Sequence, residues 1–338
     1  MQDSVQRKES HISLSLKDSC RSLLSNGFDR YRFEHVAFPE LSFDRIDTSV
    51  NFLGKRLGMP LLISSITGGS SSGVRINEIL AKVAESFNIG LAVGSQRIAL
   101  ENHDASSFQI REYAPNTLVF ANFGAVQLNY GFGIDECRRA IDMIEADAFI
   151  LHINPLQEVF QPDGNTNFSG LLNKVAEICE KVSVPVIIKE VGYGISASVA
   201  KKLHDIGVKI VDVAGSGSVS WSSIESARSN DLVIQAAAQA FKDWGNITAD
   251  LVADISQKIP EIDLIASGGI TNGVEIAKAL VLGAKLCGMA LPFLKAALKS
   301  EKECEDLIKI LQFELKTAMF CTGAASISDL KKVTLEKY

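Results

Sequence analysis

The chain lacks the features that mark membrane and secreted proteins. No uncharged apolar run approaches the length of about 18 residues that a transmembrane helix needs. Residues 1–8 contain no apolar stretch of the kind found in secretory signals. We therefore expect a cytoplasmic protein with no membrane partner.

Cysteine is scarce and scattered, which argues against both a disulfide framework and a zinc site. None of the six cysteines forms a CxxC pair or shows a zinc-ligand spacing. We predict reduced thiols, most of them in the core of an intracellular protein: Cys20, Cys137, Cys179, Cys287, Cys304 and Cys321.

Positive charge is not in excess either. The 34 lysines and arginines are outnumbered by 40 aspartates and glutamates, so the formal net charge is -6. We therefore expect no nucleic-acid partner. What the chain has in abundance is hydrophobic residues, at 46% against 22% charged, which is enough for a substantial core. Its 338 residues could form one large domain or two ordinary ones.

Short apolar strands alternate with helix-like segments from about residue 60 onward. Eight strands are predicted, over residues 61–66, 90–93, 117–122, 148–153, 184–191, 209–214, 263–267 and 285–289. Periodic segments between them predict helices over residues 73–87, 135–146, 171–181, 196–205, 248–258 and 273–282. Eight such units match a closed (β/α)₈ TIM barrel, and their even spacing favours it over an open doubly wound sheet.

The predicted barrel occupies residues 60–338. Residues 1–59 do not fit the repeat and read as an N-terminal extension packed over the barrel. Residues 216–245 form an unusually long connection after the sixth strand, of the kind used as a lid or binding loop. Residues 301–321 have helical spacing and are expected to close the barrel or to contact another subunit.

A polar cluster follows the fourth predicted strand. His152, Asn154, Gln157 and Glu158 come directly after the apolar run 148–151. In parallel α/β proteins, active sites lie at the carboxyl ends of buried strands. Three neutral hydrogen-bonding side chains beside one carboxylate suit a polar substrate and a hard cation such as Mg²⁺ better than they suit a core.

Glycines and one lysine point to a phosphate-bearing ligand at the same end of the barrel. Gly268 and Gly269 follow the seventh strand, and Gly288 precedes Met289 and Ala290 at the eighth. Backbone N–H groups without Cβ obstruction at these positions favour a phosphate site. Lys189 ends the fifth strand, where a buried ammonium needs an anionic partner or ligand.

The chain resembles type 2 isopentenyl-diphosphate isomerases, the FMN-dependent form, over essentially its whole length. Ordered motifs carry the resemblance: Arg7-Lys8-x-x-His11, Thr67-Gly68-Gly69, Gly94-Ser95-Gln96-Arg97, Ala121-Asn122, His152-x-Asn154-x-x-Gln157-Glu158, Lys189-Glu190-Val191-Gly192, the loop from Gly215 to Trp221, and Ser267-Gly268-Gly269-Ile270. The resemblance implies conversion of isopentenyl diphosphate to dimethylallyl diphosphate on reduced FMN, with Mg²⁺ and with NADPH as reductant. It also implies a homo-oligomer, either a tetramer or an octamer.

The resemblance implies a role for each matching residue. FMN is assigned to Ser65, Ile66, Thr67, Ser95, Asn122, Lys189, Ser216, Ser220, Gly268, Gly269, Ile270, Met289 and Ala290. The substrate is assigned to Arg7, Lys8, His11, Ser95, Gln96, Arg97, Asn154 and Gln157. Gln157 and His152 are the expected catalytic side chains, and Glu158 is the expected Mg²⁺ ligand.

One position departs from the family pattern. Val219 stands where the family usually has a threonine near the flavin phosphate, so Ser216, Ser218 or Ser220 is expected to substitute for it.

Three other functions fit the sequence less well. A flavin-dependent 2-hydroxy-acid oxidase would need a histidine and an arginine around Gly268 and Gly269, and the chain has Ser267 and Thr271 there. An inosinate-type dehydrogenase would need a cysteine in residues 216–221. A catalytically inactive flavin sensor would not need Gln157 and Glu158.

Overall fold

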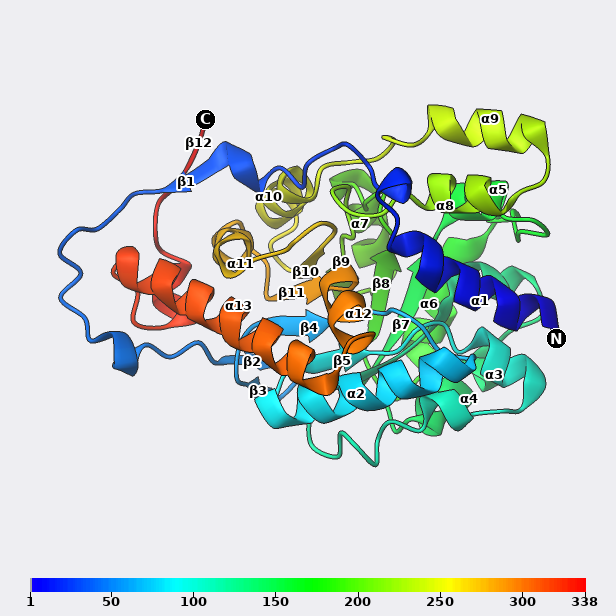
Figure 1. Ribbon diagram of the computed structural model, residues 1–338, viewed down its shortest axis with the longest axis horizontal. Helices are drawn as coiled ribbons and strands as arrows, with labels where there is room; N and C mark the ends of the chain where they lie inside the picture. Colours follow the sequence, from blue (N-terminus) through cyan, green and yellow to red (C-terminus); the bar gives the residue numbers. More distant parts are fainter. Residues whose placement is uncertain (1) are drawn as a thin grey trace.

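The computed structural model describes the backbone of residues 2–338 and the side chains of residues 6–70 and 72–338 (Figure 1). Eight parallel strands form a closed barrel in the order β10-β11-β4-β5-β6-β7-β8-β9. Their bounds are β4 (Leu61–Ile63), β5 (Gly90–Ala92), β6 (Val119–Gly124), β7 (Ala148–Ile153), β8 (Val186–Glu190), β9 (Ile210–Asp212), β10 (Asp263–Ser267) and β11 (Leu286–Met289). The predicted TIM barrel is thus confirmed, and the open doubly wound sheet is wrong.

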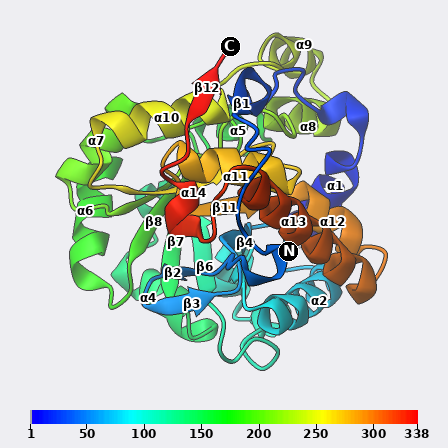
Figure 2. The ribbon, with the colours of Figure 1, turned by 90° about the vertical axis from the view of Figure 1, so that its left-hand side faces the viewer.

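Helices surround the barrel on its outside (Figure 2). The predicted ones are α2 (Ser71–Phe87), α4 (Ile134–Met143), α6 (Leu171–Lys181), α7 (Ala197–Asp205), α10 (Thr248–Lys258) and α11 (Gly273–Val281). All six agree with the predicted ranges within three residues at each end. The predicted C-terminal helix is α13 (Glu301–Cys321), which packs against α2, α11 and the short α12 (Leu291–Ala297), so it fills the ring between the first and last units.

The long connection after the sixth strand is not a structureless loop. It contains α8 (Trp221–Arg228) and α9 (Leu232–Ala240). The side chain of Asp231 caps α9 by accepting hydrogen bonds from the N–H groups of Val233 and Ile234. The sequence does contain this capping signal, but the serines and glycines before it favour a loop. Two further short helices also follow strands: α3 (Arg97–Asn102) and α5 (Pro155–Phe160).

The N-terminal segment reaches both ends of the barrel. Helix α1 (Gln2–Ser15) lies at one end, and strand β1 (Tyr31–Phe33) pairs with the C-terminal strand β12 (Leu335–Lys337) near the other (Figure 1). The hairpin of β2 (Val50–Phe52) and β3 (Lys55–Leu57) covers the amino end of the strands. Short 3₁₀ turns η1 (Asp18–Cys20), η2 (Phe28–Arg30) and η3 (Phe43–Arg45) connect these pieces. The remaining short elements are η4 (Ser106–Phe108), η5 (Ala125–Asn129) and α14 (Ile327–Leu330).

The barrel interior and the layer outside the strands are two separate apolar clusters. Interior residues include Phe120, Ile150, Ile187 and Ile265, together with Phe52 of the hairpin. Their strand neighbours, such as Ala121 and Leu151, pack outward against the helices. This alternation follows from the two-residue period of a strand. Because both faces are buried, these strands read as continuous apolar runs.

The six cysteines are unpaired, and four of them are buried. Within residues 2–338, no helix combines the length and the apolar composition that a membrane crossing requires.

Candidate functional site

A layer of polar side chains lies at the carboxyl end of the barrel interior. Two residues after each of five interior apolar residues comes a polar one, which the strand period directs to the same side: Asn122, His152, Lys189, Asp212 and Ser267. Four of these five line one large cavity, and Asp212 lies fully buried next to them. The cavity therefore has a polar floor above an apolar core.

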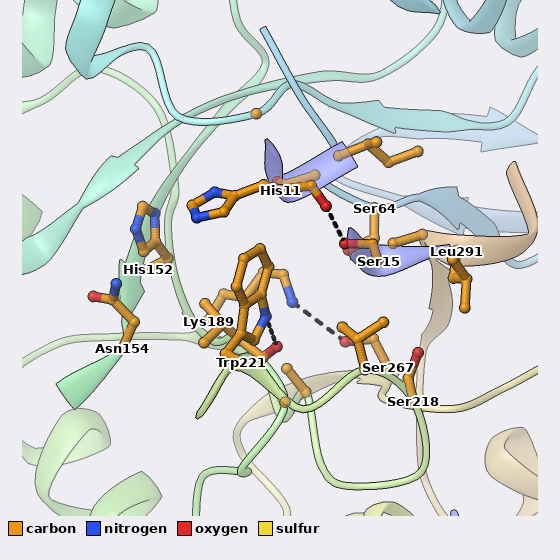
Figure 3. Close-up of a pocket in the computed structure, with 18 of the residues that line it drawn as sticks. His11, Ser15, Ser64, His152, Asn154, Lys189, Ser218, Trp221, Ser267 and Leu291 are labelled. Carbon is orange, nitrogen blue, oxygen red and sulfur yellow. Dashed lines mark hydrogen bonds between the residues drawn. The ribbon is translucent and has the colours of Figure 1, made fainter. Parts of the chain in front are cut away.

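Helix α1 supplies one wall of the cavity. Arg7, Lys8, His11, Ile12 and Ser15 line it, and their spacing of three and four residues places them on one face of the helix. The Nζ atom of Lys8 donates a hydrogen bond to the carbonyl oxygen of Ser95 at 2.9 Å. Figure 3 shows His11 and Ser15 above Lys189 and Trp221. The N-terminal extension thus lines the same cavity as the polar layer at the end of the barrel.

Most residues expected at the site from the sequence lie on this cavity. They are Arg7, Lys8, His11, Ser65, Ile66, Thr67, Ser95, Arg97, Asn122, His152, Asn154, Gln157, Glu158, Lys189, Gly268, Gly269, Ile270, Met289 and Ala290. Three expected residues do not line it: Gln96, Ser216 and Ser220.

Gln96 is committed to the interior rather than to a substrate. Its side chain is fully buried, and its Oε1 accepts a hydrogen bond from the backbone N–H of Asn122 at 2.9 Å. Its Nε2 donates to the carbonyl oxygen of Ala140 at 2.9 Å. Its neighbours Ser95 and Arg97 do face the cavity. In the motif Gly94-Ser95-Gln96-Arg97, Gln96 is therefore a structural residue, and Ser95 and Arg97 are cavity residues.

Only one of the three serines considered in place of the family threonine reaches the cavity. That residue is Ser218, which lines it together with Val219. The hydroxyl of Ser216 is buried without a hydrogen-bond partner among the described residues, and the hydroxyl of Ser220 pairs with that of Ser222 at 3.0 Å. Neither of these two serines lines the cavity, and their contact with the flavin stays a prediction.

Lys189 belongs to a buried group that spans three neighbouring strands. Its Nζ donates to the carbonyl oxygen of Glu190 at 2.9 Å and lies 3.3 Å from Oδ2 of Asp212. Ser267 Oγ donates to Oδ1 of the same aspartate at 2.5 Å. Lys189 and Asp212 are cross-strand partners in register, so their side chains lie on the same face. The aspartate offsets the cost of burying the ammonium beside the cavity.

The carboxylate of Glu190 faces the other way, as expected for the next residue along a strand. It accepts hydrogen bonds from the backbone N–H groups of residues 191–194. This fixes the loop whose Val191 carbonyl accepts a hydrogen bond from Trp221 Nε1 at 2.9 Å. Trp221 in turn lines the cavity and packs edge-on to His11, with ring centroids 5.1 Å apart.

His152 is held as a neutral ring in one tautomer. Burial lowers its pKa to about 3, and the charges of Lys189 and Lys8 act in the same direction. The Nδ2 atom of Asn122 donates to Ser65 Oγ and to the Val93 carbonyl, so Asn122 Oδ1 is the atom that faces His152 Nδ1 at 2.8 Å. Nδ1 therefore carries the proton, and Nε2 is left as an acceptor.

Gln157 is oriented by a buried carboxylate that was not predicted. Its Nε2 donates to Glu225 Oε1 at 3.0 Å, and its Oε1 accepts from Asn154 Nδ2 at 3.1 Å. Glu225 also pairs with His11 at 2.9 Å and with Arg228. Burial would raise the pKa of Glu225, but the hydrogen bonds from His11 and Gln157 and the charge of Arg228 lower it below its usual value. An ionised Glu225 thus fixes Gln157 and docks α1.

Glu158 has the surroundings expected of a ligand for a hard cation. Its carboxylate accepts hydrogen bonds from Asn154 Nδ2 at 3.0 Å and from the backbone N–H of Asn165 at 2.5 Å. Asn154 Oδ1 is buried and has no hydrogen-bond partner among the described residues. In that same part of the chain no group of three histidine, cysteine or acidic side chains could enclose a metal. The donors fit Mg²⁺ only if water and substrate oxygens complete its shell.

The glycine turns fit a phosphate. Gly268 and Gly269 have φ angles of +105° and +83°, which favour glycine. In the described chain, the N–H groups of Gly269 and Ile270 find no acceptor, although both residues line the cavity. Free N–H groups beside two glycines suit the phosphate of FMN, and Lys189 suits the polar edge of its ring.

Three residues next to this chemistry were missed by reasoning from the sequence. Asp212 interrupts an apolar strand with a charge, which is itself a signal of a functional or paired site. Glu225 follows Trp221 by four residues on α8, so both lie on the face turned toward the cavity and α1. Asn165 lies in a loop with no periodic pattern, and no local signal would have identified it.

Comparison with known proteins shows which family the chain resembles. Residues 163–337 match the family model described as FMN-dependent dehydrogenase. The chain is 49% identical to an isopentenyl-diphosphate delta-isomerase of Nostoc sp., over 96% of this chain and 93% of that protein. It is 46% identical to the protein of the same name from Stutzerimonas stutzeri, over 99% of this chain and 97% of that protein.

Two solved structures with the same fold illustrate how far the fold extends beyond close relatives in sequence. A flavocytochrome b2 variant superposes with a TM-score of 0.67 at 19% identity, covering 99% of this chain and 79% of that one. A mandelate oxidase variant with (S)-mandelic acid gives a TM-score of 0.67 at 15% identity, covering 99% and 98%. At such identity the likeness concerns the fold alone.

Proposed function

Since the chain belongs to the isopentenyl-diphosphate delta-isomerase family, we propose that it converts isopentenyl diphosphate to dimethylallyl diphosphate. The proposal includes FMN in its reduced form, Mg²⁺ on the diphosphate and NADPH as the reductant. It also includes a homo-oligomer, either a tetramer or an octamer. The reaction moves one double bond: a proton is added to the terminal carbon and another is lost two carbons away, with no net oxidation.

One observation carries the proposal. The glycine turn suited to a phosphate, the carboxylate of Glu158 and the basic side chains of α1 all line a single cavity. A flavin phosphate at Gly269 and Ile270 and a substrate diphosphate under Arg7 and Lys8 would thus share one enclosed space. This supports a flavin and a diphosphate bound side by side. A site for a single phosphate would not need both groups of residues.

The protein holds the diphosphate through charge. Arg7, Lys8 and Arg97 line the cavity near Glu158, and they supply the positive charge that a diphosphate needs. With Mg²⁺ on Glu158 and Asn154, the diphosphate would complete the coordination of the cation. These contacts fix one end of the substrate, so that its alkene end extends toward Gln157 and the floor.

The side chains of the protein contribute more by orienting the alkene than by transferring protons. When bound, reduced FMN would supply an electron-rich ring and acid–base capacity beside the double bond. Gln157 is fixed by Glu225 and Asn154, so its second N–H can stay directed at the substrate. His152 is neutral, so its Nε2 can accept a hydrogen bond from a ligand, and its pKa of about 3 makes it a weak base. Lys189, paired with Asp212, places a positive charge at the edge of the flavin site.

Reconstitution tests the proposal directly. The purified protein is mixed anaerobically with FMN, Mg²⁺ and NADPH, and isopentenyl diphosphate is followed by proton NMR. Formation of dimethylallyl diphosphate that requires all three additions is expected. Absence of a yellow complex with FMN would remove every flavin-based function. Bound and reducible FMN without double-bond migration would favour a sensor.

A flavin-dependent 2-hydroxy-acid oxidase is the alternative function that this fold would also allow. A 2-hydroxy-acid oxidase needs a basic clamp for the substrate carboxylate and a base near the flavin, and Ser267 and Thr271 supply neither. Reduction of bound FMN by mandelate or lactate in the same preparation would nevertheless overturn the isomerase proposal.

A further inference from the structure

One loop residue connects the two charged groups proposed to hold the diphosphate. Asn165 lies in the connection between α5 and α6. Its Oδ1 accepts a hydrogen bond from Arg97 Nη1 at 2.9 Å and one from Gln127 Nε2 at 3.1 Å. Its backbone N–H donates to Glu158 Oε2 at 2.5 Å. Asn165 is half-buried and does not line the cavity, whereas Arg97, Gln127 and Glu158 do. Asn165 therefore affects the cavity indirectly, through the residues that line it.

The contacts leave Arg97 and Glu158 little freedom. Arg97 Nε donates to Glu101 Oε1 at 2.7 Å, so two sides of the guanidinium are held and the remaining N–H groups are free for an anion. One oxygen of Glu158 accepts from Asn154 and the other from Asn165. Each of the two groups is therefore oriented before a ligand arrives. Asn165 contributes to both orientations, through its side chain for Arg97 and through its backbone N–H for Glu158.

The neighbouring backbone locks the loop in this position. A Cβ atom on Gly164 would lie 1.9 Å from the carbonyl oxygen of Glu158, so the loop approaches α5 as closely as only glycine allows. The far side of the loop is tied independently, because Asn129 Nδ2 donates to the carbonyl oxygens of Asn167 and Ser169 at 2.8 and 3.0 Å.

We propose that Asn165 is a positioning residue that sets the spacing of Arg97 and Glu158, so that a magnesium–diphosphate unit binds better than either ion alone. The inference rests on the proposed function for the identity of the ligand. A guanidinium loses affinity when it must be ordered at the moment of binding, and a carboxylate shared by a cation and a fixed N–H cannot swing away. The bridge thus couples the anion and cation sites.

Diphosphate binding to the flavin-free protein tests the coupling without any turnover. Inorganic diphosphate is titrated by calorimetry, with and without Mg²⁺, into wild type, Asn165→Ala and Asn129→Ala. Asn129→Ala loosens the same loop but touches neither Arg97 nor Glu158. The measured quantity is the factor by which Mg²⁺ strengthens diphosphate binding. We expect Asn165→Ala to reduce that factor by about tenfold, as for the loss of a charge-assisted hydrogen bond. Asn129→Ala should stay within about twofold of wild type by the same scale.

The outcomes separate the possible roles. Equal reduction in the two variants would show that Asn165 only keeps the loop folded, and the inference would be lost. If Asn165→Ala does not fold, Asn165→Ser takes its place, because a short hydroxyl cannot reach both Arg97 and Gln127. In the reconstituted enzyme, Asn165→Ala should raise KM for isopentenyl diphosphate while kcat changes little. A lower kcat with unchanged KM would contradict the proposal.

Failure of the proposed function gives a different result. If wild type binds magnesium diphosphate but never isomerises the substrate, the binding comparison still decides the role of Asn165. If wild type binds no diphosphate under any condition, both the substrate class and the inference are overturned.

Discussion

At the scale of single residues, Lys8 makes the affinity for a diphosphate depend on pH. Burial and, to a smaller extent, the charge of Arg7 together lower the pKa of Lys8 to about 7. Above that pH the free protein carries mostly neutral Lys8, yet an anionic ligand favours the protonated form. Binding must then take up a proton, so the affinity should fall by up to about tenfold per pH unit above pH 7.

The Lys8→Arg variant isolates this effect, since an arginine stays charged. Calorimetry at pH 8 in buffers of different ionisation enthalpy measures the proton uptake, with inorganic diphosphate as the ligand. Wild type should take up close to one more proton than Lys8→Arg. Equal uptake in the two proteins would mean that Lys8 is already charged before the ligand binds.

Gln157 should matter for turnover rather than for the flavin. Its amide is fixed by Glu225 and Asn154 and lies on the cavity wall, on α5 rather than on the glycine turns. Gln157→Ala should lower kcat by about 100-fold, in the range for losing one positioned donor. FMN affinity, followed by fluorescence quenching, should change less than about threefold because no proposed flavin contact is removed.

Gln161→Ala is the matched control, because it shortens a glutamine on the same wall one turn later without affecting Glu225. Its kcat should fall far less than that of Gln157→Ala. A similar loss in both variants, or a parallel loss of FMN binding, would show that Gln157 merely shapes the cavity.

At the scale of elements, α13 shows how an N-terminal cap fixes where a helix of the outer ring begins. Ser300 accepts a hydrogen bond from the N–H of Glu303 at 3.2 Å, and Glu301 and Glu303 add negative charge to the first turn. Ser300→Ala should lower the free energy of unfolding by about 1 kcal/mol. Urea denaturation followed by circular dichroism measures the change.

A second change in α13 serves as its control. Thr317 is mid-helix, and its hydroxyl donates to the carbonyl oxygen of Phe313. Thr317→Ala should be neutral or slightly stabilising, since alanine is the better helix former. If both variants lose the same stability, the loss reflects general repacking of α13 and the cap has no special role.

Element types were predictable wherever the local pattern was strong. The ranges of β7, α6 and α13 coincide with those predicted, because apolar periodicity runs through each of them to the end. The failures have local physical causes. Gln96 shares a motif with Ser95 and Arg97, but a motif does not reveal which side chain turns inward. The pairing of Glu225 with Gln157 joins α8 to α5, and a contact across 68 residues leaves no local trace.

At the scale of the whole molecule, the two ends of the barrel have different tasks. The carboxyl end keeps a polar cavity, and the amino end is closed by an apolar plug. Phe52, on the β2–β3 hairpin, is 4% exposed and packs with the interior residues of the barrel. The hairpin turns through Leu53 and Gly54, both with positive φ angles, which suits a two-residue loop. A closed interior below the site keeps water from entering from the far side.

The apolar plug should therefore stabilise the fold without affecting ligand binding in the cavity. Phe52→Ala removes a large buried side chain and should lower the free energy of unfolding by about 3–5 kcal/mol. Asn51→Ala changes an exposed neighbour on the same strand and should lie within about 0.5 kcal/mol of wild type. Below the melting temperature, both variants should bind FMN as wild type does, because the polar layer from Asn122 to Ser267 is untouched. Weaker FMN binding by folded Phe52→Ala would show that the apolar core transmits its packing to the floor of the cavity, and that the two ends of the barrel are not independent.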